Sequence, residues 1–388
     1  MDKVKIKDVC DILNGFAFKS DNYVDKGIRI IRIANVQKGY IEDSTPAFYP
    51  LNSTGLDKYM LDKGDLLISL TGNVGRVAIL QEEMLPAALN QRVACLRIKS
   101  DKISKGYLFH ILNSDFFERK CIQSAKGVAQ KNMSTEWLKN YKIPLYSTEQ
   151  QSEIVSVLDT LQSIICNRKY ELQMLDNLIK ARFVEMFGDP ETNSKGWAEI
   201  PLSEKLNVLG GYAFKSDQFE ETGGIPVLRI GNINSGYFKP VNMVYWKEER
   251  SLERYAMYPG DLVMSLTGTV GKDDYGNVCI LGNTYEMYYL NQRNAKLELK
   301  DGLDKYYLAE LLKFSQVKKK LTGISRGVRQ ANISNKDILN LVAPIPPMKL
   351  QQQFAAFVAQ IDKSKATVQK ALDETQLLFD SLMQQYFG

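Results

Sequence analysis

The stretch that decides the fold is residues 154–188, IVSVLDTLQSIICNRKYELQMLDNLIKARFVEMFG. Its positions three and four apart form one series, and seven of the nine members are apolar. An average spacing of about 3.5 residues keeps one seam facing a partner helix, whereas the apolar face of a lone surface helix drifts away from it. The two arginines in the series would fix the register at some cost in stability. The series is Leu158, Leu161, Ile165, Arg168, Leu172, Leu175, Ile179, Arg182 and Met186.

The same pattern occurs twice. The first helix is expected to end at Phe187-Gly188-Asp189-Pro190, where glycine supplies a left-handed cap and proline forbids continuation. A second series again runs to a Phe-Gly pair, Phe387-Gly388, 200 residues later. We therefore expect two long helices, each the partner of the other; an ordinary amphipathic helix on a single core is the alternative. The second series is Ile361, Lys365, Val368, Leu372, Thr375, Phe379, Leu382 and Tyr386.

The duplication covers almost the whole chain. Five further segments of the first half return in the same order, with an offset that drifts by only a few residues. Chance does not preserve order and spacing in this way, so the chain holds two copies of one unit. The paired segments are GFAFKSD (15–21) and GYAFKSD (211–217), RIANV (32–36) and RIGNI (229–233), GDLLISLTGNVG (64–75) and GDLVMSLTGTVG (260–271), NQR (90–92) and NQR (291–293), and GVAQKNMS (127–134) and GVRQANIS (327–334).

Each half is expected to be a mixed α and β globular domain followed by one long helix, which makes the fold class α+β. Short segments rich in Ile and Leu predict buried strands at 28–33 and 66–70, and the alternation at 93–98 predicts a half-exposed strand. Segments 107–114 and 134–140 are expected to be helical, the latter with Ser134 as its N-cap. The expected domains are 1–146, 147–190 (helix), 191–347 and 348–388 (helix).

Composition limits the class of protein. With 388 residues, 44% of them hydrophobic, the chain can form two or more full cores. No run of eighteen apolar residues predicts a membrane span, and the charged start has no signal-peptide core. Five scattered cysteines without a Cys-x-x-Cys pair suit a reducing cytoplasm and argue against a disulfide framework or a structural zinc site. A net charge of +5 permits nucleic-acid binding without requiring it.

The sequence contains no strong enzyme constellation. The single histidine, His110, lies on an apolar predicted helix, which favours a packing role, and no Cys or His cluster accompanies it. The run at 268–272, GTVGK, lacks the spacing of a phosphate-binding P-loop. Asp273, Glu298 and Lys300 resemble the carboxylate and lysine set of a Mg²⁺-dependent nuclease. Because the first half has Arg97-Ile98-Lys99 at the matching position, we keep the nuclease only as the alternative.

What both halves share is a set of polar, glycine-containing loops. The segments SLTG at 69–72 and 265–268 are expected to follow a strand, where glycine lets backbone amides approach a ligand and hydroxyls can meet phosphate oxygens. A cation lies close behind each, Arg76 or Lys272, and Lys-Gly or Arg-Gly turns occur at 126–127 and 326–327. The alternative interpretation is that these loops are framework turns kept for geometry alone.

These motifs, in this order and in duplicate, resemble the specificity subunit of type I restriction–modification systems. The resemblance covers nearly all residues and includes the Ile-Pro-Leu and Glu149-Gln150-Gln151 lead into the long helix; the second copy departs modestly, with Ile345-Pro346-Pro347 and Gln351-Gln352-Gln353. It implies two target-recognition domains, each reading half of a split DNA site. It also implies that the helices pair antiparallel, with pseudo-twofold symmetry, as a ruler. A helix of residues 152–188 would measure about 55 Å, more than one DNA turn of roughly 34 Å.

The resemblance further implies a non-catalytic chain. Its partners would be double-stranded DNA, two methyltransferase subunits and, in full complexes, two translocating nuclease subunits, with no membrane. The chain itself would hold no cofactor, since S-adenosylmethionine, ATP and Mg²⁺ would belong to the partner subunits.

The duplication also sorts residues by role. Positions identical in both halves cannot distinguish two half-sites, so they are expected to build the scaffold or touch phosphates. Base readers are expected where the halves differ, at 40–60 against 237–257 and at 76–89 against the Tyr- and Asn-rich 272–290. The residues expected at the DNA are Lys19, Ser20, Ser69, Thr71, Asn73, Arg76, Arg92, Lys126, Gln130 and Asn132 in the first half, and Lys215, Ser216, Ser265, Thr267, Thr269, Lys272, Tyr275, Asn277, Arg293, Arg326, Arg329, Gln330 and Asn332 in the second.

Overall fold

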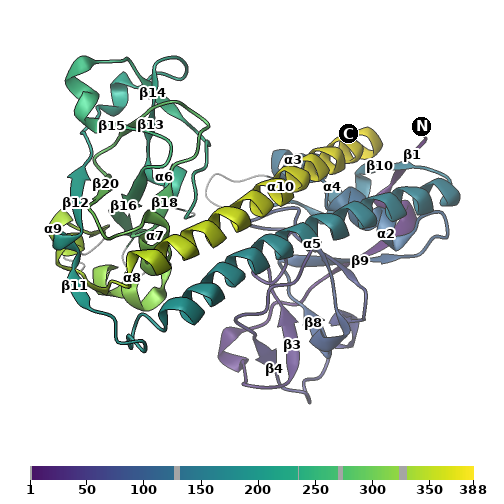
Figure 1. The fold of residues 1–388 in the computed structure, drawn as a ribbon. Coiled ribbons are helices and arrows are strands. Elements are labelled where there is room, and N and C mark those ends of the chain that lie inside the picture. The colour runs from purple at the N-terminus through teal and green to yellow at the C-terminus, as the bar shows by residue number, and fades with distance from the viewer. Residues whose placement is uncertain (1, 126–131, 235, 270–273, 323–329) are drawn as a thin grey trace. The chain divides into compact units, whose positions relative to one another are not determined.

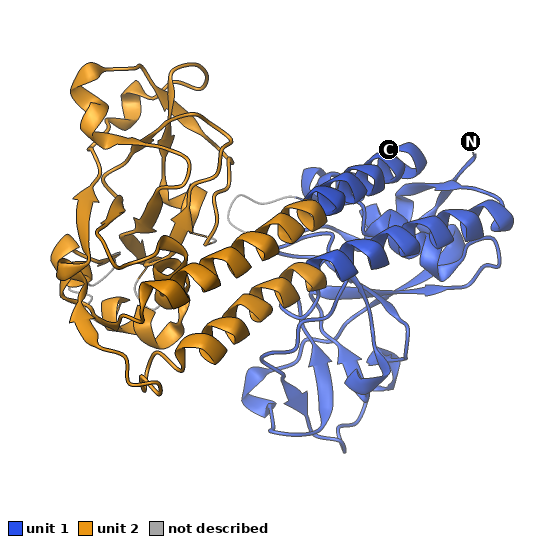
Figure 2. Ribbon diagram, viewed as in Figure 1, with its two compact units in different colours: residues 1–169, 370–388 blue, residues 170–369 orange. Residues whose placement is uncertain are grey.

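The computed structural model divides the chain into two compact units (Figure 2). The first comprises residues 1–169 with 370–388, and the second residues 170–369. The structure describes residues 2–125, 132–234, 236–269, 274–322 and 330–388. Both long helices, α5 (Thr148–Phe187) and α10 (Met348–Phe387), contribute residues to both units (Figure 1). We call the rest of each unit its head.

The first head contains two four-stranded sheets. One has the strand order β2-β9-β6-β7 and is antiparallel throughout, while the other has the order β4-β3-β8-β5 with β3 and β8 parallel. A two-stranded sheet, β1-β10, closes the head. The elements are β1 (Asp2–Lys5), α1 (Ile6–Val9), β2 (Cys10–Asn14), β3 (Ile28–Ile31), β4 (Phe48–Tyr49), β5 (Met60–Leu61), β6 (Leu66–Ser69), β7 (Val77–Ile79), β8 (Ala87–Leu89), β9 (Val93–Ile98), α2 (Lys105–Leu112), α3 (Asp115–Ser124), α4 (Thr135–Asn140) and β10 (Lys142–Leu145).

The second head has the same topology. Its sheets have the orders β12-β20-β16-β18 and β14-β13-β19-β15, with β13 and β19 parallel, and β11 pairs with β22. The duplication and the mixed α and β character are thus confirmed. The elements are β11 (Glu199–Pro201), β12 (Leu206–Gly210), β13 (Ile225–Leu228), α6 (Ile230–Ile233), β14 (Val244–Trp246), β15 (Ala256–Met257), β16 (Leu262–Ser265), β17 (Thr267–Thr269), β18 (Val278–Ile280), β19 (Tyr288–Leu290), β20 (Asn294–Leu299), α7 (Lys305–Lys313), α8 (Ser315–Thr322), β21 (Gln330–Asn332), α9 (Asn335–Asn340) and β22 (Val342–Pro344).

The central strand β9 shows where the sequence prediction fails. Val93 and Cys95 enter the core between the two sheets, whereas Ala94 and Leu96 enter the core beneath α2. All four are at most 1% exposed, so the predicted half-exposed strand is wrong. A strand covered on both faces alternates between two cores rather than between core and solvent. The other predicted elements are present: β3 and β6 as buried strands, α2, and α4 with Ser134 accepting from the Trp137 N–H at 3.1 Å.

The long helices pair antiparallel, as expected. In the first unit, Arg168 of α5 donates hydrogen bonds to the Ala371 carbonyl and to the Thr375 hydroxyl of α10. In the second unit, the Lys365 ammonium contacts the Asp176 carboxylate at 2.6 Å. The early part of one helix therefore meets the late part of the other. Of the predicted seam residues, Leu158, Ile165, Ile179 and Leu372 are buried, and Leu161, Leu172, Leu175, Ile361, Val368, Phe379 and Leu382 are half-buried.

The ends of both helices enter the head cores. In the second unit, the Phe183 and Phe187 rings of α5 lie 5.5 and 5.4 Å from the Phe354 ring of α10, and both contact Tyr307 of α7. In the first unit, the Phe387 ring of α10 lies 5.6 Å from the Tyr107 ring of α2. Each head core is therefore completed by two helices that are distant in sequence.

A buried glutamine ties each long helix to its head. Gln151 is fully buried; its amide oxygen accepts from the Ser104 N–H at 2.9 Å, and its amide nitrogen donates to the carbonyls of Lys102 and Tyr146 at 2.8 and 2.9 Å. The amide thus satisfies three backbone groups at the point where the helix leaves the head. In the second unit, Gln351 makes the same contacts with the Asp304 N–H and the Gly302 and Pro346 carbonyls.

Three smaller expectations can be compared with the structure. His110 is 2% exposed and its Nε2 lies 2.7 Å from the Asp159 carboxylate, as suits a packing residue. The five cysteines are free thiols, and only Cys166 is exposed. Within the described ranges, no helix is both long and apolar enough to cross a membrane.

We predict that Gln151→Leu lowers the free energy of unfolding by about 2 kcal/mol or more, because one buried N–H and two buried carbonyls lose their partner. Chemical denaturation measures this change. Gln162→Leu, an exposed change on the same helix, is the control and should stay within about 0.5 kcal/mol of the unchanged chain. Equal effects of the two variants would contradict the glutamine's role.

We predict non-additive effects at the polar seam pair. Positions 168 and 375 carry arginine and threonine, whereas their repeat counterparts, 368 and 175, carry valine and leucine. Thr375→Leu should destabilise the chain by removing one acceptor of Arg168, and adding Arg168→Val should restore stability, because an apolar pair can replace a polar one without loss. A double-mutant cycle in denaturant should give a coupling of about 0.5–3 kcal/mol. Additive effects would mean that the contact between Arg168 and Thr375 contributes no coupling energy to stability.

Candidate nucleic-acid interface

Backbone hydrogen bonds gather the repeated loops at one edge of each head. The Phe16 N–H donates to the Leu89 carbonyl at 2.8 Å, and the Gln91 N–H donates back to the Phe16 carbonyl at 2.9 Å. The Leu70 N–H donates to the Arg92 carbonyl at 2.9 Å, which joins the NQR segment to the turn that follows β6. The second head repeats these three contacts, through Tyr212 with Leu290, Gln292 with Tyr212, and Leu266 with Arg293.

The loop at 15–21, and its repeat at 211–217, can approach the NQR segment only because each begins with glycine. A Cβ on Gly15 or on Gly211 would lie 2.2 Å from the backbone of Asn90 or Asn291, respectively. That distance is far inside van der Waals contact, so any side chain would push the two loops apart. The repeated glycine therefore has a steric role in both heads.

A buried serine holds the turn after β6 and after β16. The Ser69 hydroxyl, fully buried, accepts from the Arg76 N–H at 3.0 Å, and the Ser265 hydroxyl accepts from the Asn277 N–H at 3.1 Å. Both hydroxyls are thus occupied inside the turn. Ser69 and Ser265, expected at the DNA, are framework residues because burial keeps them from a ligand.

The same contacts correct the alignment of the two turns. Arg76 occupies the backbone position of Asn277, and Gly75 that of Gly276, since each glycine N–H donates to the serine carbonyl. The second turn is therefore five residues longer, and the sequence pairing of Arg76 with Lys272 is wrong. Asn277 has no charge of its own; its amide oxygen accepts from the buried Lys318 ammonium at 2.7 Å.

The described part of the Tyr-rich segment, residues 274–290, is mostly interior. Tyr275, Tyr288 and Tyr289 are at most 4% exposed, and the Tyr275 hydroxyl donates to the Thr322 carbonyl at 2.9 Å. Three of its four tyrosines therefore build cores instead of offering rings to bases. Tyr285 is half-buried, and its hydroxyl lies 3.3 Å from that of Tyr245, a contact that raises the pKa of Tyr285 to about 12.

The remaining expected residues differ in exposure. Arg92 and Arg293, the last residues of the two NQR segments, are both exposed. Thr71, Arg76, Thr267 and Asn277 are half-buried. Lys126, Gln130, Lys272, Arg326 and Arg329 lie outside the described residues, and of Gln330 only the backbone, in β21, is described. The exposed residues are Lys19, Ser20, Asn73, Arg92, Asn132, Lys215, Ser216, Thr269, Arg293 and Asn332.

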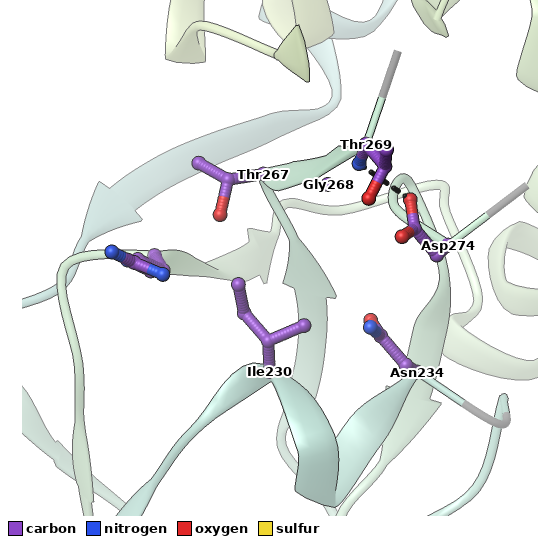
Figure 3. A pocket seen from close by; sticks show the side chains of 7 residues that line it. Ile230, Asn234, Thr267, Gly268, Thr269 and Asp274 are labelled. Atoms are coloured by element: carbon purple, nitrogen blue, oxygen red, sulfur yellow. Dashed lines mark hydrogen bonds between the residues drawn. The ribbon is translucent and has the colours of Figure 1, made fainter. Parts of the chain in front are cut away.

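A pocket of about 500 Å³ opens beside the turn of the second head (Figure 3). The Asn234 and Thr267 side chains point into it, and the Asp274 carboxylate accepts from the Thr269 N–H at 2.8 Å on its far side. Asn234 was not expected from the sequence. Its only signal is that it follows the repeated RIGNI segment at a place where the first half has Gln37. The pocket is lined by Ile230, Asn234, Thr267, Gly268, Thr269, Asp274 and Arg293.

Comparison with known proteins identifies this arrangement. The model of the family described as type I restriction modification DNA specificity domain matches residues 1–174 and 194–375, which is most of the chain. The chain belongs to this family. Members of this family provide the DNA sequence specificity of type I restriction–modification systems.

Individual members of the specificity family are distant relatives. The type I restriction enzyme MjaVIII specificity subunit of Methanocaldococcus jannaschii is 32% identical over 184 residues, which are 46% of this chain and 43% of that protein. The type I restriction enzyme EcoBI specificity subunit of Escherichia coli is 22% identical, over 99% of this chain and 85% of that one. The crystal structure of a type I system S subunit from M. genitalium has the same fold, with a TM-score of 0.57 at 16% identity over 100% of this chain and 96% of that one.

The structure places two residues of the nuclease alternative, Glu298 and Lys300, away from the turn after β16. In the β16–β20 register, Ser265 faces Asn294 and Leu262 faces Leu297. Glu298 therefore lies at the opposite end of the sheet from the turn that carries Asp274, and the Lys300 ammonium donates to the Ser203 carbonyl at 2.9 Å. Asp273 lies outside the described residues. Across the described part of the chain, no three His, Cys, Asp or Glu side chains are grouped to hold a metal ion.

We predict that Arg92→Ala and Arg293→Ala each weaken duplex binding by a similar factor for all sequences. An exposed arginine shared by two heads suits a phosphate contact, and losing one such contact should reduce the slope of log K against log salt by about 1. A salt titration with a cognate and an unrelated duplex measures both effects. Arg119→Lys, an exposed change on α3 that keeps its charge, is the control. Loss confined to the cognate duplex would instead make these arginines base readers.

Proposed function

We propose that this chain is a non-catalytic DNA specificity subunit in which each head reads one half of a bipartite target. The observation that carries the proposal is the loop platform of each head, by which we mean the loop that begins at Gly15 or Gly211, the NQR segment, and the turn held by Ser69 or Ser265. In both heads the same glycine, serine and backbone contacts position the turn after β6 or β16. The exposed arginine that ends the NQR segment is also shared, while the side chains around the turn differ. A common frame with different side chains suits two readers of two different sequences.

The long helices are proposed to fix the spacing of the half-sites and to dock methyltransferase subunits. Helices α5 and α10 each contain 40 residues, or about 60 Å at 1.5 Å per residue. Their seam residues face inward, which leaves their outer faces for partners. We propose two methyltransferase subunits and, in the full complex, two translocating nuclease subunits. S-adenosylmethionine, ATP and Mg²⁺ would act in those partners, and the assembly would work in the cytoplasm.

The decisive experiment is a methylation map of DNA from cells that express the chain with its candidate methyltransferase partner. We expect one methylated motif of two short defined halves around a fixed unspecified gap. Absence of methylation, with expression and complex formation verified, would contradict the proposal. A methylated motif that is continuous, without an unspecified gap, would contradict the assignment of one half-site to each head.

The enzyme alternative is tested separately. The purified chain is incubated with Mg²⁺ and duplex DNA, beside a Glu298→Ala variant. We expect no cleavage by either protein. Cleavage that is lost in the variant would support the nuclease and overturn the non-catalytic assignment.

A further inference from the structure

The two heads differ at the position that follows the repeated RIANV and RIGNI segments, Gln37 in the first head and Asn234, which lines the pocket, in the second. In the second head Asn234 points into the pocket, and its amide oxygen is buried without a hydrogen-bond partner among the described residues. The Thr267 hydroxyl, at the start of β17 on the turn side of the pocket, is likewise buried and has no hydrogen-bond partner among the described residues. A buried acceptor without a donor costs free energy that a suitable ligand would recover. Two such groups on one pocket mark it as a site to be completed by a bound molecule.

In the first head the corresponding place holds two hydrogen-bonded side chains, Gln37 and Arg76. Gln37, the counterpart of Asn234, accepts a hydrogen bond from the Arg76 guanidinium, and its amide nitrogen donates to the Ala34 carbonyl at 2.8 Å. Both ends of the glutamine side chain are thus engaged. Arg76 is oriented through one terminal nitrogen and is half-buried, which leaves the other edge of its guanidinium for a ligand. The glutamine is a positioning residue, and the group presented to the outside is the arginine.

An arginine in one head and an asparagine in the other would recognise different bases. Arginine donates two parallel hydrogen bonds to O6 and N7 of guanine, whereas asparagine accepts from N6 and donates to N7 of adenine. The unpartnered Asn234 amide oxygen requires a donor, which adenine N6 supplies in the major groove, where guanine shows only acceptors. Cytosine N4 is also a donor there, but only adenine pairs it with the N7 acceptor that the Asn234 amide nitrogen needs. We infer that Arg76, held by Gln37, reads a guanine in one half-site and that Asn234 reads an adenine in the other. This inference rests on the proposed function and adds to it the residue and the base at one position of each half.

The shared residues around the two readers fit this assignment. Thr71 and Thr267 each carry a buried hydroxyl that has no partner in the described parts of the chain, and Arg92 and Arg293 are exposed. Groups that are identical cannot discriminate, so the choice of base falls to the side chains that differ. The differing pairs are residue 76 against 277, which backbone contacts align, and residue 37 against 234, which align by their place directly after the repeated RIANV and RIGNI segments.

The test uses the full chain in its complex with the methyltransferase partner. Asn234→Asp keeps the shape of the side chain but removes its donor, and Arg76→Lys keeps the charge but removes the two-pronged donor. Methylation maps are compared for the unchanged chain, both variants, and two matched controls, Asn340→Asp at the exposed end of α9 and Arg119→Lys on α3. Thermal unfolding verifies that each variant is folded.

We expect the unchanged motif to require an adenine in one half and a guanine in the other. Asn234→Asp should relax the adenine requirement, by between about 5-fold and about 150-fold, and Arg76→Lys should relax the guanine requirement in the opposite half. The controls should leave the motif unchanged. If a folded variant gives no methylation, its binding to duplexes carrying each base at that position is measured, and loss of preference among them is the expected result.

Several outcomes would overturn the inference without touching the proposed function. These are a split motif that lacks the adenine or the guanine, an unchanged motif in either variant, changes that fall in the same half-site, and uniform weakening on all duplexes, which marks a phosphate contact. If the unchanged chain yields no split motif at all, the proposed function fails instead.

Discussion

The structure depends on the burial of both long helices in both head cores. Phe183 and Phe187 pack on both Tyr307 and Phe354 in the second unit, and Phe387 packs on Tyr107 in the first. Fully burying one such ring contributes on the order of 2 kcal/mol, so several rings together are comparable with the net stability of a domain. Neither core is complete without residues from two helices far apart in sequence. The heads and the helices therefore fold as parts of the same cores.

The glutamine clamps and tyrosine hydroxyls add direction to this apolar burial. Gln151 and Gln351 each satisfy three backbone groups where a helix leaves its head, and the Tyr107 and Tyr307 hydroxyls donate to the Pro144 and Pro344 carbonyls at 3.1 and 2.6 Å. Hydrophobic burial alone does not select a helix orientation, whereas an amide with three fixed partners does. The recurrence of both devices explains how two divergent halves keep one geometry.

The loop platform separates what must stay constant from what can vary. The glycine at 15 or 211 and the serine at 69 or 265 fix the ends of the loops from inside the head. Because those ends are fixed, the second turn accommodates five extra residues, and its pocket side chains differ from those of the first. Loops held at both ends by a rigid frame tolerate insertion and substitution, and such loops carry binding functions in many folds.

The sequence by itself determined the repeat, the two long helices, the mixed α and β heads and the family resemblance. Each of these depends on local periodicity or on the order of segments along the chain, and both can be read from the sequence alone. Only the tertiary structure showed that Val93 and Ala94 enter different cores, that Ser69 and Tyr275 are interior, and that Arg76 aligns with Asn277. It also showed that Asn234 faces a pocket. Such facts depend on which elements cover a residue and on hydrogen bonds between segments far apart in the chain, and a residue's type and spacing do not encode its neighbours across the fold.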